Sequence, residues 1–150
     1  MKPAFHPYEG SEPYIFAWYS PEDAETVVPI LDALNRAGYR VWYYRVQAGH
    51  RRENIVAEHI IHCSVFLLFL SRSSVNSENL DDCYIESSYA RHKKRVVIPV
   101  YLDAVELPPG LEMGLHVVQH MRFSDYSGSD HFALALQYEE SFKLCKASES

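Results

Sequence analysis

The stretch SVFLLFL, residues 64–70, decides the fold, because every residue after Ser64 is apolar. A second stretch, RVVIPVYL at residues 95–102, is almost as continuously apolar and is rich in Val. Half-exposed strands alternate apolar and polar residues, whereas strands covered on both faces do not. Both stretches are therefore predicted to be central strands of a parallel sheet with helices on both faces.

Three further apolar runs, at residues 14–19, 39–44 and more weakly 116–123, are predicted strands. Segments with apolar residues at helical spacing lie between these runs. Alternation of strands and helices predicts an α/β fold, with right-handed crossovers and a doubly wound sheet. The expected helices cover residues 20–38, 53–63, 80–95, 108–115 and 131–145.

The first expected helix carries clear end signals. Ser20 is in place to cap it, Pro21 suits its first position, and Gly38 is a stop signal. Pro29 is expected to kink the helix or to delay its start. No linker or repeat interrupts the chain, so one domain is predicted over residues 12–145, with short tails at 1–11 and 146–150.

The composition limits the partners and the compartment. The 150 residues carry a net charge of −6, which argues against a duplex nucleic-acid binder. The chain opens without an apolar leader, and its longest apolar run is far too short to span a membrane. Its three cysteines are widely spaced, so a disulfide framework is not expected. A protein of the reducing cytoplasm, without membrane contact, is predicted.

Several chemical motifs are absent or weak. No Gly-rich phosphate loop follows the first strand, which disfavours a Rossmann-type dehydrogenase. The third strand ends in Ser71, where a phospho-accepting receiver domain would need an aspartate. His59 and His62 share one helix side, but no second ligand cluster accompanies them, so no metal site is predicted. The basic run at residues 91–95 suits the C-terminal end of a helix.

Ligands of such sheets gather beyond the carboxyl ends of the strands. The polar loop at residues 45–54, which follows the second strand, carries several cations. It is either a solvated connection or a cationic loop over an anionic ligand. In the helix at residues 80–95, Asp82 and Glu86 lie one turn apart beside the apolar stripe. Two neighbouring carboxylates raise each other's pKa. From spacing alone, the first interpretation of Glu86 is a solvated charge at the border of the apolar stripe, and the second is a catalytic carboxylate.

In their order along the chain, five segments resemble the Toll/interleukin-1 receptor (TIR) domain of the bacterial, stand-alone kind. The CxxE pattern of that family falls on Cys83 to Glu86. The five segments are EPYIFAWYSPEDAE, LNRAGYRVWY, ENIVAEHIIHCSVFLLFLSRSSVNSEN, CYIESSYARHKKRVVIPVYL and LPPGLEMGLHVVQHMRF.

The resemblance implies a flavodoxin-like, three-layer fold with five parallel strands. It also implies cleavage of the nicotinamide–ribose bond of NAD, which is substrate rather than cofactor, with Glu86 as the catalytic glutamate. The family further implies cyclisation or conjugation of the ADP-ribose, self-association through TIR–TIR contacts, and a nucleotide product that acts on an effector in Thoeris-type anti-phage defence.

Five further residues are expected to bind the substrate. Tyr19 and Ser20 follow the first strand, and Tyr44 and Arg45 follow the second, with Arg45 assigned to the pyrophosphate. Ser77, in the loop before the helix that carries the glutamate, is the fifth.

The chain departs from the family pattern around this site. Ala17-Trp18-Tyr19 stands for Ile-Ser-Tyr, Tyr44 for an aspartate, Ala48-Gly49 for Pro-Gly, and Asp82 for the tryptophan before the cysteine. Two alternatives therefore remain. One is a non-catalytic TIR module that only assembles with other TIR domains, and the other is a nucleoside deoxyribosyltransferase-like enzyme.

Overall fold

The computed structural model of the chain describes residues 1–46 and 49–147. Ala48 and residues 148–150 of the predicted C-terminal tail lie outside the described residues. The elements follow one another as β1 (Ile15–Trp18), η1 (Pro21–Asp23), α1 (Ala24–Arg36), β2 (Val41–Tyr43), α2 (Arg52–His62), β3 (Val65–Leu70), α3 (Leu80–His92), β4 (Val96–Tyr101), α4 (Pro109–Leu115), β5 (Met121–Arg122), η2 (Phe123–Asp125), α5 (Ser129–Leu136) and η3 (Glu140–Cys145).

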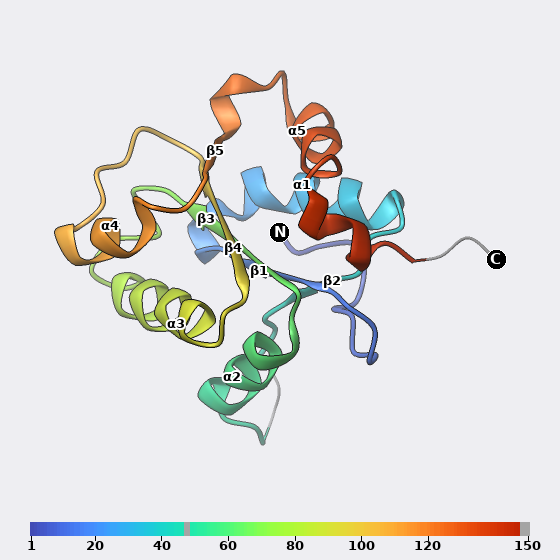
Figure 1. Ribbon diagram of the computed structural model, residues 1–150, viewed down its shortest axis with the longest axis horizontal. Helices are drawn as coiled ribbons and strands as arrows, with labels where there is room; N and C mark the ends of the chain where they lie inside the picture. The colour runs from blue at the N-terminus through green and yellow to red at the C-terminus, as the bar shows by residue number, and fades with distance from the viewer. Residues whose placement is uncertain (47–48, 148–150) are drawn as a thin grey trace.

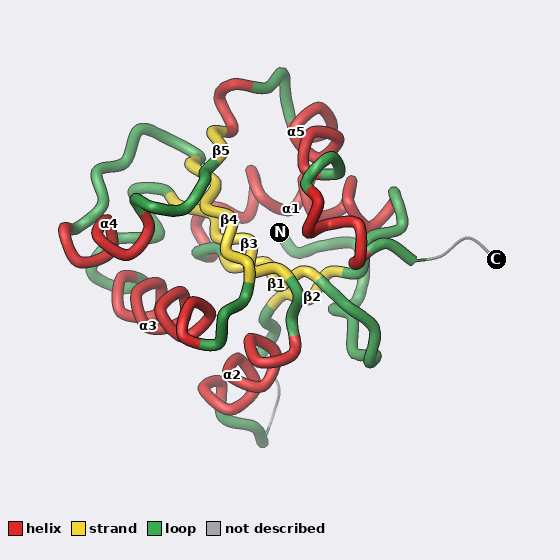
Figure 2. Tube along the Cα trace, in the orientation of Figure 1, coloured by secondary structure: helices red, strands yellow, loops and turns green. Residues whose placement is uncertain are grey.

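The five strands form one parallel sheet in the order β2-β1-β3-β4-β5 (Figure 2). Every residue of β3 is buried, and β1 and β4 flank it. The predicted fold class, an α/β sandwich with a flavodoxin-like strand order, is confirmed. The weak run at residues 116–123 contributes only the two residues of β5, at the edge of the sheet.

Helices cover both faces of the sheet (Figure 1). Alternate residues of each strand point to opposite faces, so Ile15 and Ala17 join one apolar cluster while Phe16 and Trp18 join the other. The first cluster lies under α1 and α5, and the second lies under α2, α3 and α4. Trp18 therefore points toward the side of the sheet that carries α3.

Two predicted helices differ from the structure. The first begins as a 3₁₀ turn, and α1 proper runs from Ala24 through Pro29, whose missing N–H costs one backbone hydrogen bond. Ser20 precedes the turn, but its hydroxyl makes no cap to the backbone. The single helix expected at residues 131–145 is wrong, because α5 ends at Leu136 and a separate 3₁₀ helix follows.

The first nine residues lie beside the edge strand β2. The Tyr8 amide donates to the Val41 carbonyl at 2.9 Å, and the Tyr43 hydroxyl donates to the Phe5 carbonyl. Phe5 also packs its ring edge-on against Tyr43, with centroids 5.4 Å apart. These contacts pair part of an edge that would otherwise expose unpaired backbone groups.

Candidate active site

A cavity of about 530 Å³ opens at the carboxyl ends of β1 and β2. The start of the chain, the first residue of α2 and the first turn of α3 complete its wall. The cavity is thus at the edge of the sheet where ligands of doubly wound folds bind. Its lining includes Trp18, Tyr19, Tyr44, Arg45, Arg52 and Asp82.

Glu86 lies directly behind this lining, on the face of α3 that is turned to the sheet. Glu86 is only 7% exposed, and its neighbours Cys83 and Ser87 on this helix are buried as well. The expectation from spacing alone, a solvated border charge, is therefore wrong for this side chain. A carboxylate in such a position needs partners, because burial of an unpaired charge is very costly.

Two donors from distant parts of the chain satisfy the Glu86 carboxylate. The indole N–H of Trp18 donates to Oε1 at 2.8 Å. The Arg52 guanidinium donates to Oε2 through Nη1 at 2.5 Å and to Oε1 through Nη2 at 3.4 Å. Both carboxylate oxygens are thus engaged, one by an aromatic donor from β1 and both by the first residue of α2.

Burial raises the pKa of the Glu86 carboxyl above its usual value. The Arg52 guanidinium opposes this effect most strongly, and the Trp18 hydrogen bond opposes it as well. The Asp82 carboxylate raises the pKa further by charge repulsion. Desolvation thus outweighs the paired cation, and carboxyl groups with raised pKa values in clefts are candidates for functional sites.

Arg52 connects the rest of the site. Its Nη1 lies 3.6 Å from Asp82 Oδ2, and its guanidinium carbon lies 4.8 Å from the centre of the Tyr44 ring. The Arg52 side chain keeps 34% of its surface exposed. The sequence marked Arg52 only as one cation of the polar loop, whereas the structure makes it the closest charged partner of Glu86.

The predicted substrate-binding residues have different surroundings. Tyr19 lines the cavity, and burial raises its pKa to about 12. Ser20 also lines it, but its hydroxyl donates to Asp23 Oδ2 at 2.8 Å, and the Ser71 hydroxyl donates to the same oxygen. Ser20 is 1% exposed, so this hydroxyl holds the turn between β1 and α1 together.

On the β2 side, the Tyr44 ring lies under Arg52, while Arg45 Nη1 lies 3.0 Å from His6 Nδ1. Ser77 is exposed and is not part of the lining. Asn79, two residues later, lines the cavity instead. Trp18 and Arg52, which the sequence did not assign to the site, are both hydrogen-bond partners of the Glu86 carboxylate.

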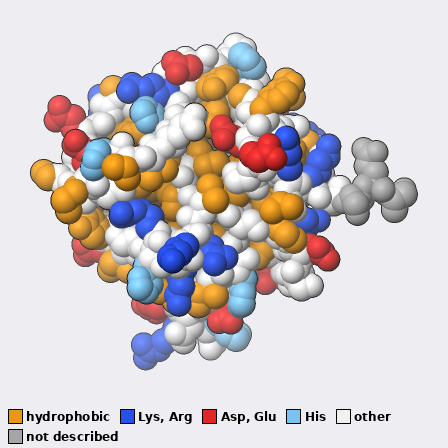
Figure 3. Space-filling model, in the orientation of Figure 1, with side chains coloured by type: hydrophobic (Ala, Val, Ile, Leu, Met, Phe, Trp, Pro, Cys, Tyr) orange, Lys and Arg blue, Asp and Glu red, His pale blue; other side chains and the backbone are white. Residues whose placement is uncertain are grey.

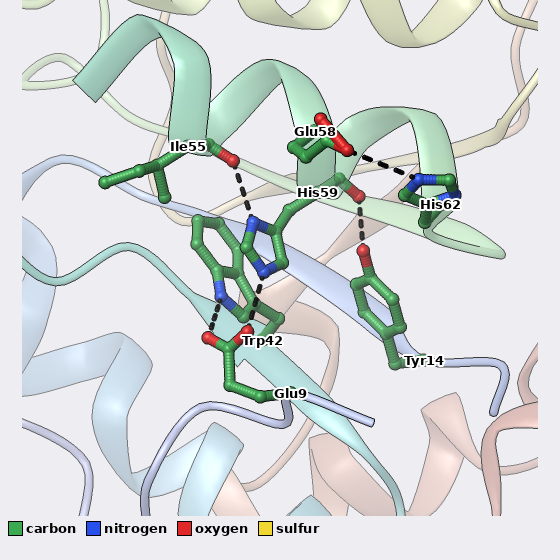
Figure 4. A network of polar contacts seen from close by, with 7 residues as sticks. All are labelled: Glu9, Tyr14, Trp42, Ile55, Glu58, His59 and His62. Atoms are coloured by element: carbon green, nitrogen blue, oxygen red, sulfur yellow. Dashed lines mark hydrogen bonds and ion pairs between the residues drawn. The ribbon is translucent and has the colours of Figure 1, made fainter. Parts of the chain in front are cut away.

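The histidine pair of α2 has partners other than a metal. His59 stacks on Trp42 with centroids 4.0 Å apart, and its two ring nitrogens lie 2.7 Å from the Ile55 carbonyl and 3.0 Å from Glu9 (Figure 4). His62 faces Glu58 at 3.7 Å. No group of three or more metal-ligating side chains occurs in the described residues.

The basic run at residues 91–95 lies where α3 ends. Arg91 and His92 occupy the last turn, and Lys93 caps it. Figure 3 shows Lys and Arg side chains grouped over the lower part of this face, where α2 and α3 lie in Figure 1. In residues 1–46 and 49–147, no helix combines the length and apolarity needed to cross a membrane.

Comparison with known proteins gives one family match and several structural likenesses. The model of the TIR domain family matches residues 15–137. The TIR domain of the Toll-related receptor TRR-2 from Hydra magnipapillata is 18% identical, with 74% of this chain and 84% of that chain covered at a TM-score of 0.58. The CMP N-glycosidase BcmB from Clostridium botulinum is 16% identical, with 83% and 97% covered at 0.57. At these identities the likeness concerns the fold. No curated protein matches the sequence.

Proposed function

The chain belongs to the TIR-domain family, and from that premise we propose that it is an enzyme that cleaves the nicotinamide–ribose bond of NAD. The observation that carries the proposal is the buried Glu86 carboxylate, which lies behind the cavity wall at the carboxyl edge of the sheet. The Trp18 indole and the Arg52 guanidinium hold this charge in its buried position.

The chemistry suits a fixed carboxylate. When the C1′–N1 bond breaks, its electron pair leaves with nicotinamide, and the ribose carbon becomes part of an oxocarbenium ion, as in glycoside cleavage. A negative group held in a partly desolvated pocket stabilises that cation more than water does. The oxygen of a water molecule then bonds to C1′ and a proton is released, which yields ADP-ribose. Glu86 is assigned the role of stabilising the ribosyl cation.

The remaining parts of the proposal concern the fate of the product. If a hydroxyl or base of the same nucleotide takes the place of water, the product is cyclic ADP-ribose, and if a nucleophilic group of a second molecule does so, the product is conjugated ADP-ribose. We place such a nucleotide signal in bacterial cytoplasmic anti-phage defence of the Thoeris type, where it would act on an effector. Self-association through TIR–TIR contacts would complete the NAD site from a neighbouring chain.

The test is nicotinamide release from NAD, followed by mass spectrometry with concentrated protein. Glu86→Gln keeps the shape of the side chain and removes its charge, so we expect turnover to fall by about 100-fold or more. Glu78→Gln changes an exposed glutamate just before α3 and should turn over normally. Full activity of Glu86→Gln would refute the catalytic role.

The likeness to the CMP N-glycosidase favours a second candidate, hydrolysis of another nucleotide N-glycosidic bond by the same carboxylate. Parallel incubations with CMP, and nucleoside exchange assays, separate this activity from NAD cleavage. The engagement of both Glu86 oxygens favours a third candidate, a non-catalytic assembly module. That candidate predicts no turnover of any nucleotide, even in self-associated samples.

A further inference from the structure

The space in front of Glu86 is occupied by a planar cation that belongs to the chain itself. The Arg52 guanidinium lies over the Tyr44 ring at 4.8 Å and donates to the Glu86 carboxylate at 2.5 Å. Asp82 Oδ2 lies 3.6 Å from Nη1 of the same guanidinium. Two carboxylates and an aromatic ring thus surround one delocalised positive charge.

The location of Arg52 is unfavourable in other respects. It is the first residue of α2, and the N-terminal end of a helix repels positive charge through the helix dipole. Arg51 precedes it and adds a second cation at the same end. The contacts with Glu86, Asp82 and Tyr44 therefore hold Arg52 at the cavity against this repulsion, while a third of its side chain stays in solvent.

We propose that Glu86, Asp82 and Tyr44 form a binding box for a planar organic cation, and that Arg52 fills this box until a cationic substrate displaces it. The inference rests on the proposed function in one respect: the oxidised nicotinamide ring of NAD is a planar cation of this class. A cationic ring gains the same two kinds of contact that Arg52 gives up, charge attraction to the carboxylates and cation–π stacking on Tyr44.

The box also decides between substrates. A neutral base such as cytosine cannot replace the charge of Arg52, so its entry would leave the buried Glu86 carboxylate without a counter-ion. A pyridinium ring restores the charge balance when the guanidinium moves into solvent. Arg52 thus excludes neutral bases and admits cationic ones, which makes it a specificity-determining residue.

The experiment uses 1-methylnicotinamide, which is methylated on the ring nitrogen and is a pyridinium cation, and nicotinamide as its neutral counterpart, with binding measured by calorimetry. In Arg52→Ala the dissociation constant of the cation should fall by about tenfold or more, because the probe no longer competes with a charge-assisted hydrogen bond. Nicotinamide should gain much less. Arg51→Ala, which removes an adjacent exposed cation, should bind both probes like the unmodified chain.

Equal affinity of the cation for Arg52→Ala and the unmodified chain overturns the proposal, as does an equal gain for the neutral probe. Arg52→Met keeps the aliphatic stem, and it replaces Arg52→Ala if thermal unfolding shows that Arg52→Ala is not folded. If Arg52→Met is not folded either, the Trp18 indole N–H signal of the unmodified chain must shift saturably in NMR spectra on titration with the cation but not with nicotinamide. Absence of this difference refutes the box.

The outcome is independent of catalysis. If NAD is not cleaved but the Arg52 variants gain affinity for the cation, the proposed function fails and the box stands. If NAD is cleaved through Glu86 but the variants gain nothing, the function stands and the box fails.

Discussion

Replacement of Trp18 by phenylalanine tests whether the indole N–H controls the charge of Glu86. Trp18 is 5% exposed, and its only polar atom donates to a buried carboxylate at 2.8 Å. Phenylalanine keeps an aromatic ring in the second core cluster and removes the donor. Among residues 1–46 and 49–147, the Glu86 carboxylate then keeps only Arg52, from the cavity side, as a side-chain hydrogen-bond partner.

The magnitude follows from the kind of bond that is lost. A hydrogen bond to a buried charged group contributes about 1.5–3 kcal/mol to stability. For a chain of this length, each kcal/mol lowers the melting temperature by about 2–4 °C, so a decrease of about 3–12 °C is expected. Because the lost bond favours the ionised form, the pKa of Glu86 should rise further above its ordinary value. The acidic limb of the pH–activity profile should move to higher pH with it.

Trp42 offers a matched control on the neighbouring strand. Its indole N–H also donates to a carboxylate, at 3.0 Å, but that carboxylate belongs to Glu9, whose side chain is 57% exposed. Trp42→Phe therefore makes the same change of ring but loses only a solvent-screened hydrogen bond. The assay is the pH dependence of nicotinamide release, with Glu86 ionisation followed by carboxyl ¹³C NMR. An unchanged titration of Glu86 in Trp18→Phe, or an equal displacement in Trp42→Phe, would refute the reasoning.

Three further predictions concern stability and reactivity. The pKa of Glu86 is higher in the folded chain than in the unfolded chain, so the folded chain binds this proton more tightly. The free energy of unfolding of the unmodified protein, relative to that of Glu86→Gln, should therefore fall as pH rises above about 4.5 and level off above the raised pKa. Urea unfolding at several pH values measures this difference, and an increase with pH would contradict the prediction. Asp23→Ala leaves two buried serine hydroxyls without their acceptor and should cost about 2–3 kcal/mol in chemical unfolding, whereas the exposed Glu25→Ala should cost little. Burial raises the pKa of Cys63 and Cys83 to about 12, so iodoacetamide at pH 8 should modify them only after unfolding; modification in the folded chain would disprove this.

The fold was largely predictable from the sequence because its signal is local. Six successive apolar residues in β3 leave no face for solvent, and the alternation of strands with helical patterns limits the connections. The errors lie where propensity competes with packing. The run at residues 131–145 has apolar residues throughout, yet the α-helix ends at Leu136 and a 3₁₀ helix follows. The local pattern of apolar residues does not specify where an α-helix must end so that the following residues can pack into the core.

The site was predictable in position but not in its contacts. The carboxyl ends of β1 and β2 are fixed by topology, and Tyr19 and Tyr44 line the cavity there. The partners of Glu86 are 68 and 34 residues away in sequence. The periodicity of apolar residues carries no information about contacts between residues so far apart in the sequence. The sequence predicts Arg45 as a ligand of the pyrophosphate because it follows the second strand directly, whereas the structure pairs Arg45 with His6 and brings Arg52 of α2 to the carboxylate.

Two departures from the family pattern meet at this carboxylate, and their effects are complementary. Position 82, where the family often has a tryptophan, holds an aspartate that pairs with Arg52 at 3.6 Å. Position 18, at the end of the first strand, holds a tryptophan that donates to Glu86. In this chain the aromatic donor to Glu86 comes from the sheet, and the helix position carries a second negative charge. Asp82 raises the pKa of Glu86 by charge repulsion and the Trp18 hydrogen bond lowers it, so the two residues act on this carboxyl group in opposite directions. Asp82 thus helps to hold the Arg52 guanidinium at the site, while Trp18 holds the Glu86 carboxylate in place.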